Sequence, residues 1–559
     1  MNRCSRGCWG LLGLLAFSAM DCHGGRTPTG NPTQPAPQPE KVVELLFSTR
    51  ILNTTEPCGC TSTPLGDVAR IAGLVSPANT LLLDAGGLRY EPVAISPNRR
   101  EQARLKADFL EQTWARLGAV TAVQPEDLRG ENGLSELKNA RRVCANLSGL
   151  PDGVVLPWVL ASRQGLTFAV IGLADPQATW PTGVAVTDPS LALEHQLKDL
   201  GSAIAVVLAA MPRERVRPLA RKFPTVRLWV VGADDKFPEG KGDPERLGDA
   251  LILTPGKKGE RLYRVALHLS SQGMPVWRWQ PTPQQRKTTA ENHLKRVQQT
   301  EKQLALLRTD PAADPAFIQT LSEELARLHL ELSEAERPLP KLNGFVTAEL
   351  VPIERRFPRD PKVRQALDDL DRRIGQANLQ AASVPPPRAS AESPSFVGMA
   401  ACLGACHFHE AAHTLWRNTQ HSRAFRTLAE VGKQLSYDCV RCHTTGFEEP
   451  GGSNLFSLHT WQTATAEPVG LGPDLRNITC ETCHGPGSKH IGKPSKNNIP
   501  TPRPTEDTCL GCHTPEHSDT FEWKAYARSI LGPGHGSFTR QELGDGPTGK
   551  ELRRAAAHK

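Results

Sequence analysis

The sequence predicts a multidomain chain with an α/β domain, a helical hairpin and a cysteine- and histidine-rich domain, in that order. Three patterns predict this organisation. From residue 41 to about 283, short β-branched runs alternate with helical patterns. From 286 to 336 the pattern becomes that of amphipathic helices. After residue 400 the chain carries eight of its 14 cysteines and twelve of its 17 histidines, and the last domain must explain this crowding.

Composition excludes several classes of protein. With 559 residues, the chain has room for several domains of roughly 100–200 residues each. A hydrophobic content of 38% and a charged content of 22% exclude a polytopic membrane protein and a wholly disordered chain. The net charge of +7 is mild for this length, whereas a nucleic-acid-binding domain carries a stronger, clustered excess. We therefore expect no nucleic-acid partner.

The first residues indicate export. Arg3 and Arg6 precede an apolar run over residues 9–19, which has the length of a signal-peptide core and is too short to span a bilayer comfortably. We expect residues 1–22 to be a signal peptide and the mature protein to lie in the periplasm or cell envelope. Cys22 is a candidate for lipidation, and cleavage after Ser18 is the alternative.

Two Pro-rich segments, 23–40 and 376–395, are predicted to be linkers, because such segments pack no core. They set off an α/β domain over 41–283. Its predicted strands are Val42–Ser48, Leu81–Asp84, Val143–Asn146, Thr167–Gly172, Ile204–Leu208 and Val226–Gly232.

Residues 284–375 are predicted to form the helical hairpin. Leucines at 321, 325, 328 and 332 lie on one helical face. Asp314 and Pro315 fit the N-cap and first position of the second arm. The leucine stripe packs either within this chain or against another protein, and the pattern leaves that choice open.

The last domain, predicted over 396–540 with a tail over 541–559, carries three C-x-x-C-H motifs. Two thiols at this spacing can each add to a vinyl group of one haem, and the adjacent histidine then binds the iron. A fourth element, C-x-x-x-C-H, has one extra residue between its cysteines. The predicted cofactor is haem c, four per chain. The attaching cysteines would be Cys402, Cys406, Cys439, Cys442, Cys480, Cys483, Cys509 and Cys512, and the proximal histidines would be His407, His443, His484 and His513.

Two other interpretations of these pairs are weaker. A zinc ribbon also uses C-x-x-C pairs, but it does not require a histidine directly after each pair. Disulfides suit an exported protein, yet a two-residue loop repeated with a following histidine is a poor scaffold.

Further histidines can serve as second axial ligands, because haems that only carry electrons usually have two. We predict His421, His490 and His535 as the distal ligands, with His459 and His517 as reserves. For His409, His413 and His558 a surface position is the expectation. Three distal ligands for four haems would leave one haem five-coordinate and able to bind a small molecule.

Residues 396–536 resemble the cytochrome c-554-type tetrahaem family. The resemblance is carried by Phe396-Val-Gly-Met-Ala-Ala-Cys402, Trp416-x-x-Thr-x-His421, Asp438–Gly446, Cys480–Gly487 and Cys512–Glu516. It implies a mostly α-helical tetrahaem cytochrome c domain with closely stacked haems, and it supports His421, His490 and His535 as axial ligands. The first motif departs from the family, which has two residues between these cysteines.

Residues 41–270 are similar in layout to the 5′-nucleotidase branch of calcineurin-like metallophosphoesterases. The similarity rests on strand Val42–Ser48, Gly66–Gly73 and Leu81–Gly86, and it implies a metallophosphoesterase-like sandwich. Such enzymes hold two divalent metals with about seven ligands, and this chain lacks most of them at the matching positions. A hydrolase rebuilt from Glu126, Asp127, Asp234 and Asp235 is the alternative to solvated loop carboxylates.

In the place of the first metal-binding loop stands Glu56-Pro-Cys58-Gly-Cys60. A related branch of exported nucleotidase-like proteins carries this Cys-Gly-Cys, in which a selenocysteine can replace one cysteine. Cys58 and Cys60 are either a redox-active dithiol or part of a structural disulfide, within the loop or to Cys144.

The sequence therefore favours an exported multihaem electron-transfer protein whose nucleotidase-like domain is a binding or thiol-redox module. Its expected partners are redox proteins of the periplasm or membrane, with a small-molecule ligand as a further option and a membrane contact only through a lipidated N-terminus. The alternatives are an exported phosphoesterase fused to a cytochrome, and a haem enzyme acting on a small nitrogen or sulfur compound.

Overall fold

A computed structural model of the chain describes residues 41–57, 59–129, 141–234, 243–382, 389–390, 392–407, 411–532, 535 and 542–557, without the side chains of 405 and 406. Several predictions lie outside the described residues. They are the signal peptide over 1–22 with Cys22, the linker over 23–40, Cys58, Asp235, His409, His558 and the side chain of Cys406.

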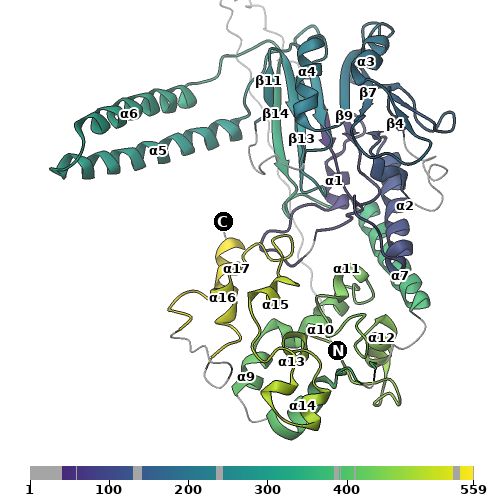
Figure 1. The fold of residues 1–559 in the computed structure, drawn as a ribbon. Helices are drawn as coiled ribbons and strands as arrows, with labels where there is room; N and C mark the ends of the chain where they lie inside the picture. The colour runs from purple at the N-terminus through teal and green to yellow at the C-terminus, as the bar shows by residue number, and fades with distance from the viewer. Residues whose placement is uncertain are drawn as a thin grey trace, which may run out of the picture. The chain divides into compact units, whose positions relative to one another are not determined.

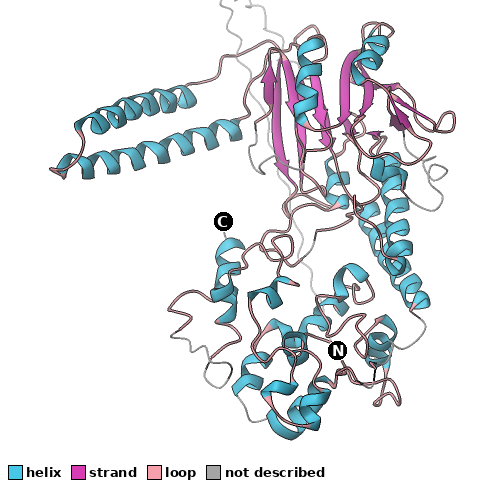
Figure 2. Cartoon of the chain, viewed as in Figure 1, coloured by secondary structure: helices cyan, strands magenta, loops and turns pink. Residues whose placement is uncertain are grey.

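Two six-stranded sheets form the α/β part (Figures 1 and 2). The first has the order β14-β13-β1-β2-β3-β4, in which β1 to β4 run parallel and β13 runs antiparallel to both of its neighbours, β1 and β14. The second has the order β11-β12-β10-β9-β7-β6, with β6 and β11 antiparallel to their neighbours. The predicted sandwich is confirmed.

The strands of the first sheet are β1 (Val42–Ser48), β2 (Thr80–Asp84), β3 (Val120–Ala122), β4 (Arg141–Val143), β13 (Arg261–His268) and β14 (Phe345–Pro352). Those of the second are β6 (Trp158–Arg163), β7 (Leu166–Ala174), β9 (Ile204–Ala210), β10 (Leu228–Val231), β11 (Glu245–Leu247) and β12 (Ala250–Leu253). A small separate pair is β5 (Leu147–Ser148) with β8 (Ala185–Val186).

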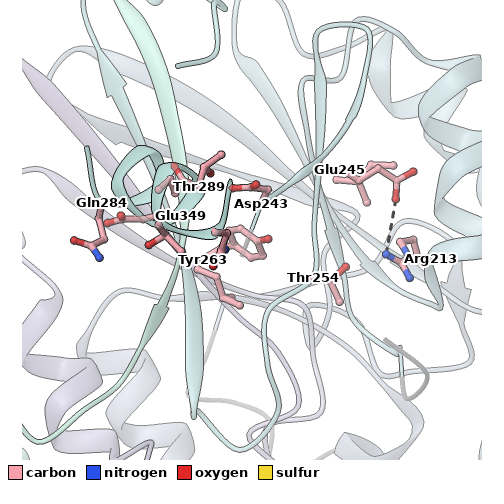
Figure 3. Close-up of a pocket in the computed structure, with 13 residues that line it drawn as sticks. Arg213, Asp243, Glu245, Thr254, Tyr263, Gln284, Thr289 and Glu349 are labelled. Atoms are coloured by element: carbon pink, nitrogen blue, oxygen red, sulfur yellow. Dashed lines mark hydrogen bonds and ion pairs between the residues drawn. The ribbon is translucent and has the colours of Figure 1, made fainter. Parts of the chain in front are cut away.

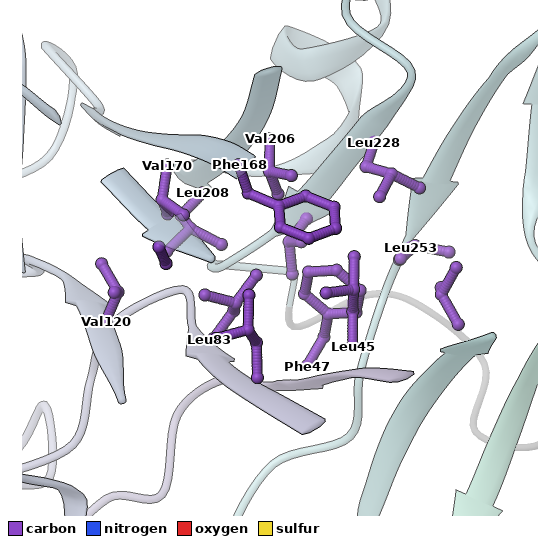
Figure 4. Packing of buried hydrophobic residues seen from close by; sticks show 14 of the residues in the cluster. Leu45, Phe47, Leu83, Val120, Phe168, Val170, Val206, Leu208, Leu228 and Leu253 are labelled. Atoms are coloured by element: carbon purple, nitrogen blue, oxygen red, sulfur yellow. The ribbon is translucent and has the colours of Figure 1, made fainter. Parts of the chain in front are cut away.

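The main core lies between the two sheets (Figure 4). Phe47 and Leu83 of the first sheet belong to one buried cluster with Phe168 and Leu208 of the second. Helices bury the outer faces: α1 (Val68–Leu74), α2 (Arg100–Arg116) and α7 (Pro361–Ala381) on the first sheet, α3 (Pro189–Leu197) and α4 (Arg213–Lys222) on the second. Burial on both faces explains why the central strands are nearly continuous apolar runs.

The predicted hairpin is present but shorter than expected. It consists of α5 (Pro283–Thr309) and α6 (Pro315–Glu336), and it extends away from the sheets in Figure 1. Asp314 caps α6, accepting from the Ala316 N–H at 2.9 Å. Val297, Leu304 and Leu328 are buried, so at least part of the leucine stripe packs within this chain.

The segment that follows the hairpin corrects two predicted boundaries. Strand β14 pairs with β13 at the edge of the first sheet, so it belongs to the α/β part and not to a hairpin over 284–375. Helix α7 continues to Ala381, into the range 376–395 that we predicted as linker. The reason is burial, since Leu370, Ile374 and Asn378 face the core or α2.

The C-terminal part consists of short helices joined by loops (Figure 2), and the predicted mostly α-helical domain is confirmed. Its helices are α8 (Gly398–Cys402), η4 (Leu403–His407), α9 (Ala411–Arg417), η5 (Gln420–Arg423), α10 (Ala424–Ala429), α11 (Tyr437–Val440), α12 (Leu455–Thr463), α13 (Cys480–His484), α14 (Ser488–Gly492), η6 (Lys496–Asn498), α15 (Glu506–Leu510), α16 (Trp523–Ala527) and α17 (Gly549–Ala557). Two short 3-10 helices of the α/β part are η1 (Pro97–Arg99) and η2 (Pro125–Leu128). No helix in the described part of the chain is both long and apolar enough to cross a membrane.

Candidate functional site

Each regular motif lies on or beside a short helix. The first cysteine of each motif lies on α11, α13 or α15, and the motif histidine follows it by four positions. Residues four apart share one face of a helix. In the third motif, which lies entirely on α13, local structure therefore places both thiols and the histidine toward the same side, as haem attachment requires.

The extra residue of the first motif coincides with a change of helix type. Helix α8 ends at Cys402, and Leu403–His407 form a π-helical turn. A π turn bonds residues five apart, where an α turn bonds residues four apart. Cys402 and His407 are five apart, so the inserted residue is accommodated and His407 keeps the place that the other motif histidines have.

Three motif histidines face a second imidazole. The ring centroids of His407 and His490 are 6.3 Å apart, and those of His484 and His535 are also 6.3 Å apart. His513 and His421 lie 6.1 Å apart. The interplanar angles are 17°, 59° and 45°. If one metal ion were bound between two such rings, these angles would be free to vary, because each ring could turn about its bond to the metal.

These separations fit one metal ion between each pair. A metal–imidazole bond is about 2.0–2.1 Å long, so two imidazoles on opposite sides of one metal hold their ring centres about 6 Å apart. Direct ring stacking would bring the planes closer. The predicted distal histidines His421, His490 and His535 are thus each brought opposite a motif histidine.

The other ring nitrogen of most of these histidines is already hydrogen-bonded. The Nδ1 atoms of His443, His484, His490 and His535 bond to main-chain carbonyls at 2.6–2.9 Å. A carbonyl oxygen only accepts, so each Nδ1 carries the proton and donates it. Metal-binding histidines are held in this way, which leaves Nε2 as the ligand atom.

His421 fits a metal ligand for a different reason. Burial lowers the pKa of its imidazole to about 4, and the neighbouring His513 and His443 contribute to this lowering. The ring is therefore neutral, which is the form that binds metals. Its Nδ1 is buried and has no hydrogen-bond partner within the described residues.

His443 differs from the other three motif histidines. No described imidazole forms a ring pair with it, although its Nδ1 bond to Ala424 at 2.7 Å orients it as the others are oriented. Of the remaining histidines, His413 stacks on Trp416 with centroids 6.1 Å apart. The reserves His459 and His517 are not among the imidazoles of the three pairs that the described residues form.

Thiols of different motifs are neighbours. Cys402 is within hydrogen-bonding reach of Cys480, and Cys512 of Cys442. Cys480 also lies 3.7 Å from the Met399 sulfur, just before the first motif. The first motif is therefore adjacent to the third, and the second to the fourth.

The strand ends of the sandwich, where a metallophosphoesterase would hold its metals, are closed by hydrogen bonds. The buried Asp127 carboxylate accepts the N–H groups of Gly87, Leu88, Arg89 and Gln124 at 2.8–3.1 Å. The Gln124 amide donates to Ala85 O at 3.0 Å and to Gly232 O at 2.8 Å, joining the two sheets. No cluster of three or more metal-binding side chains occurs among the described residues.

Two of the four carboxylates of the alternative hydrolase, Asp127 and Asp234, already have partners. Asp127 is occupied by main-chain N–H groups, and Asp234 lies 3.6 Å from the Arg213 guanidinium. Burial raises the pKa of the third strand-end carboxyl, Asp84, to about 7, although Ser48 and the Gly86 N–H bond to it. Asp84 and Asp127 are thus both buried and hydrogen-bonded within the fold.

The loop that contains the Cys-Gly-Cys sequence touches the C-terminal part. The Cys60 carbonyl accepts from Arg553 of α17 at 2.7 Å, and the Ser62 N–H donates to Asp519 at 2.9 Å. Glu56, at the start of the loop, bonds to Lys433 at 2.8 Å and to Arg364. The loop thus lies between the sandwich and the segment that follows the fourth motif.

Cys144 is not the partner of this loop. It is a buried free thiol 3.5 Å from the Asn146 Oδ1, and burial raises its pKa to about 12. A disulfide from the loop to Cys144 is therefore wrong for this structure. A bond between Cys58 and Cys60 stays a prediction, since Cys58 lies outside the described residues.

A second contact joins α2 to the second motif. Asp438, next to Cys439, is paired with Arg99 and Lys106, each at 2.6 Å. Asn378 of α7 donates to the Leu435 carbonyl at 2.8 Å. The sandwich therefore contacts the C-terminal part near both the second and the fourth motif.

The described residues also line a pocket of about 570 Å³ between the sheets and the start of α5 (Figure 3). Its wall includes three carboxylates, Asp243, Glu245 and Glu349, and one guanidinium, Arg213, which is paired with Glu245 at 4.0 Å. None of the predicted site residues lines this pocket, although Arg213 in its wall also lies 3.6 Å from Asp234.

The described part of the chain thus combines a domain of short helices, which carries three imidazole pairs, with an α/β sandwich of two sheets. The family described as "Cytochrome c554 and c-prime" matches residues 401–485. Cytochrome c-554 of Nitrosomonas europaea is 28% identical over 137 residues, which cover 19% of this chain and 53% of that protein. The chain thus spans about half the length of this curated relative, and the predicted cytochrome c-554 resemblance is confirmed.

Solved structures similar to the α/β part include two phosphoesterases. A 5′-nucleotidase precursor from Thermus thermophilus is 20% identical with a TM-score of 0.36, over 42% of this chain and 53% of that one. The calcineurin-like phosphoesterase YfkN from Bacillus subtilis is 18% identical with a TM-score of 0.34, over 42% of this chain and 88% of that one.

Three features of the site could not be predicted from the sequence. The π turn of the first motif has no local signal beyond the extra residue itself. The pairing of each distal histidine with a particular motif depends on tertiary structure. Glu481, which lies between the cysteines of the third motif, is buried and bonded to two other segments. The sequence shows only that an acidic residue stands inside this motif, and it does not indicate the partners of that residue.

Proposed function

We propose that this chain is an exported multihaem cytochrome that transfers electrons, and that its nucleotidase-like domain is a binding or thiol-redox module without hydrolase activity. The observation that carries the proposal is the set of three imidazole pairs, each about 6 Å between centroids and each containing one motif histidine.

Haem c, when bound, supplies reversible one-electron chemistry at its iron. The chain's own groups hold and orient that cofactor. Main-chain carbonyls fix His484, His490 and His535 through Nδ1. The contacts between thiols of different motifs support close packing of the cofactors, first beside third and second beside fourth.

The number of haems is proposed to be four. The π turn favours the first motif as a genuine site, because it lets His407 face His490 at the same separation as the regular pairs. Attachment through Cys406 as well as Cys402 is part of this proposal.

The sandwich is proposed to serve the cytochrome rather than to hydrolyse phosphoesters. Its strand ends are closed by Asp127 and Gln124, which favours a binding role over catalysis. Closure of a Cys58–Cys60 dithiol to a disulfide would release two electrons, one to each of two oxidised haems, and two protons to water. The contacts of Cys60 and Ser62 with Arg553 and Asp519 bring this loop near the fourth motif, which supports the thiol-redox role.

Export to the periplasm or cell envelope is supported by the signal-like residues 1–22, with Cys22 as the lipidation candidate. In that compartment the partners would be soluble or membrane-bound redox proteins. The Asp438 and Glu56 ion pairs lie within the chain, so the docking of a partner would use other surfaces.

A second candidate function is favoured by one observation. His443 faces no second imidazole in the described part of the structure, so the second haem is proposed to be five-coordinate. An open iron position would allow a small nitrogen or sulfur compound to bind and react.

A redox titration of the holoprotein, followed by haem absorbance, tests the proposed function. We expect reversible uptake of several electrons per chain, and no hydrolysis of nucleotide or phosphodiester substrates with added Mn²⁺. Hydrolysis that Asp234→Asn abolishes would instead establish the phosphoesterase. A protein without any reversible absorbance change would contradict electron transfer.

A further inference from the structure

The carboxylate of Glu481 joins three segments of the cytochrome domain. It stands between Cys480 and Cys483 on α13, and only 3% of the residue is exposed. Its oxygens accept the Val397 N–H at 3.0 Å, the Gly398 N–H at 2.7 Å and the Gly487 N–H at 2.7 Å. All three N–H groups belong to segments other than α13.

The segment before α8 and the segment before α14 each lead to one histidine of the first imidazole pair. Gly398 begins α8, which leads through the π turn to His407. Gly487 is the N-cap of α14, which contains His490. His407 and His490 are the pair with nearly parallel rings, 17° apart. One side chain of the third motif thus fixes the start of both helices whose imidazoles face each other.

We propose that Glu481 is a positioning residue that holds the His407–His490 pair in place for the first haem and ties that haem to the third motif. This inference rests on the proposed multihaem function. Glu481 acts through main-chain N–H groups and bonds to no imidazole of the described residues, so it positions the site rather than taking part in its chemistry.

The position of Glu481 in its helix supports this role. Cys480, Cys483 and His484 are spaced three and four apart and share one helix face, whereas Glu481 is rotated by about 100° from Cys480. The helix can therefore hold a haem on one face and the N–H cluster on another.

The equivalent position in the two other regular motifs argues against a role in haem attachment. Val440 follows Cys439, and Leu510 follows Cys509. An acidic residue directly after the first cysteine is thus not a general feature of the C-x-x-C-H motifs of this chain. What distinguishes the third motif is that α13 packs against α8, where buried main-chain donors require an acceptor.

The surroundings are tight enough to make the contact specific. A Cβ atom added at Gly487 would lie 3.3 Å from the Glu481 Oε1 and 3.3 Å from the Val397 Cγ2. Gly487 has a φ of -95°, which alanine adopts without strain. Next to it, Ser488 and Ser395 exchange two hydrogen bonds at 2.8 and 3.1 Å.

The test compares ferric electron paramagnetic resonance spectra of the holoprotein and of Glu481→Gln. The amide keeps the size of the side chain, but it replaces one acceptor oxygen with a donor and removes the charge. We expect Glu481→Gln to lose one of three bis-histidine low-spin signals, to gain a high-spin signal of equal intensity, and to keep the wild-type haem content. Three unchanged low-spin signals would overturn the proposal.

Two further variants make the result decisive. Glu506→Gln changes an exposed carboxylate on α15, beside the fourth motif, and should leave the spectrum unchanged. If Glu481→Gln fails to fold, Gly487→Ala takes its place, because the added methyl group crowds the same carboxylate. Gly487→Ala should weaken the same low-spin signal. An unchanged spectrum for Gly487→Ala would then overturn the proposal. A wild-type protein without bis-histidine signals would instead refute the proposed function itself.

Discussion

The imidazoles of His407 and His490 face each other with ring centroids 6.3 Å apart and planes 17° apart, although they lie on separate helices. His407 follows the atypical first motif, and His490 is held by its Nδ1 bond to Ser495 O at 2.9 Å. The separation is that of two ligands of one metal and not that of a ring contact. The motif that departs most from the regular spacing therefore has the same ligand arrangement as two regular motifs.

Substitution of His490 tests this pairing. His490→Ala should convert one low-spin haem per chain to the high-spin form, while the haem stays covalently attached through its cysteines. Ferric electron paramagnetic resonance measures the change. His413→Ala is the matched control, because His413 stacks on Trp416 and pairs with no motif histidine among the described residues. Equal spectra for His490→Ala and the wild type would refute the pairing.

No imidazole of the described residues faces His443, and this predicts that one small gas molecule binds per chain. The reduced protein should bind one carbon monoxide or nitric oxide per chain, because three of the four motif histidines face a second imidazole. Optical titration with each gas measures the stoichiometry. His490→Ala should raise it to two. A wild type that binds no gas would contradict the open side of His443.

Asp127 is predicted to stabilise the sandwich rather than to bind metal. Its carboxylate is fully buried and accepts four main-chain N–H groups. Asp127→Asn places a donor among donors and should lower the free energy of unfolding by about 2–3 kcal/mol. Calorimetry measures the loss, with Asp152→Asn in an exposed loop as the control. A loss equal to that of the control would contradict the structural role.

Glu56 predicts a pH-dependent contact between the two parts of the chain. Burial alone would raise its pKa, but Lys433 and Arg364 outweigh burial and lower the pKa below its usual 4.5. A lowered folded-state pKa means that the stabilisation is complete above about 4.5 and is lost as the pH falls through the folded value. The contact should therefore weaken only in acid.

Hydrogen exchange of the segments around Glu56 and Lys433, measured from pH 7 down to 3, tests this dependence. Glu56→Gln should weaken the contact by about 1–3 kcal/mol at neutral pH and remove the acid transition. Glu354→Gln, at a half-buried carboxylate of the same part that pairs locally with Arg356 at 2.8 Å, should leave the transition in place. An acid transition that persists in Glu56→Gln would exclude Glu56 as its source.

Much of the fold was predictable because its signals are local. Strand β1 begins and ends where its apolar run predicts, at Val42 and Ser48. The second arm of the hairpin starts at the predicted cap, Asp314. The regular haem motifs contain their spacing in five consecutive residues, so no tertiary information is needed to recognise them.

The remainder depends on contacts between distant segments. β14 pairs with β13, which lies on the other side of the hairpin in the sequence. Residues 345–352 alone do not indicate which strand is their partner. Each distal histidine could be proposed from its position in the sequence. Which motif histidine it faces could not be predicted, because the pairing depends on how α13, α14 and the loops pack. The strand-end network of Asp127 and Gln124 likewise requires both sheets to be in place.

The central claim is that four covalent haems are held by this chain. Intact mass spectrometry of the exported protein, combined with a pyridine haemochrome assay, tests it most directly. Four haems per chain in the wild type, falling to three in a Cys402→Ala, Cys406→Ala double variant, is the predicted result. A colourless protein with the mass of the polypeptide alone would contradict the claim.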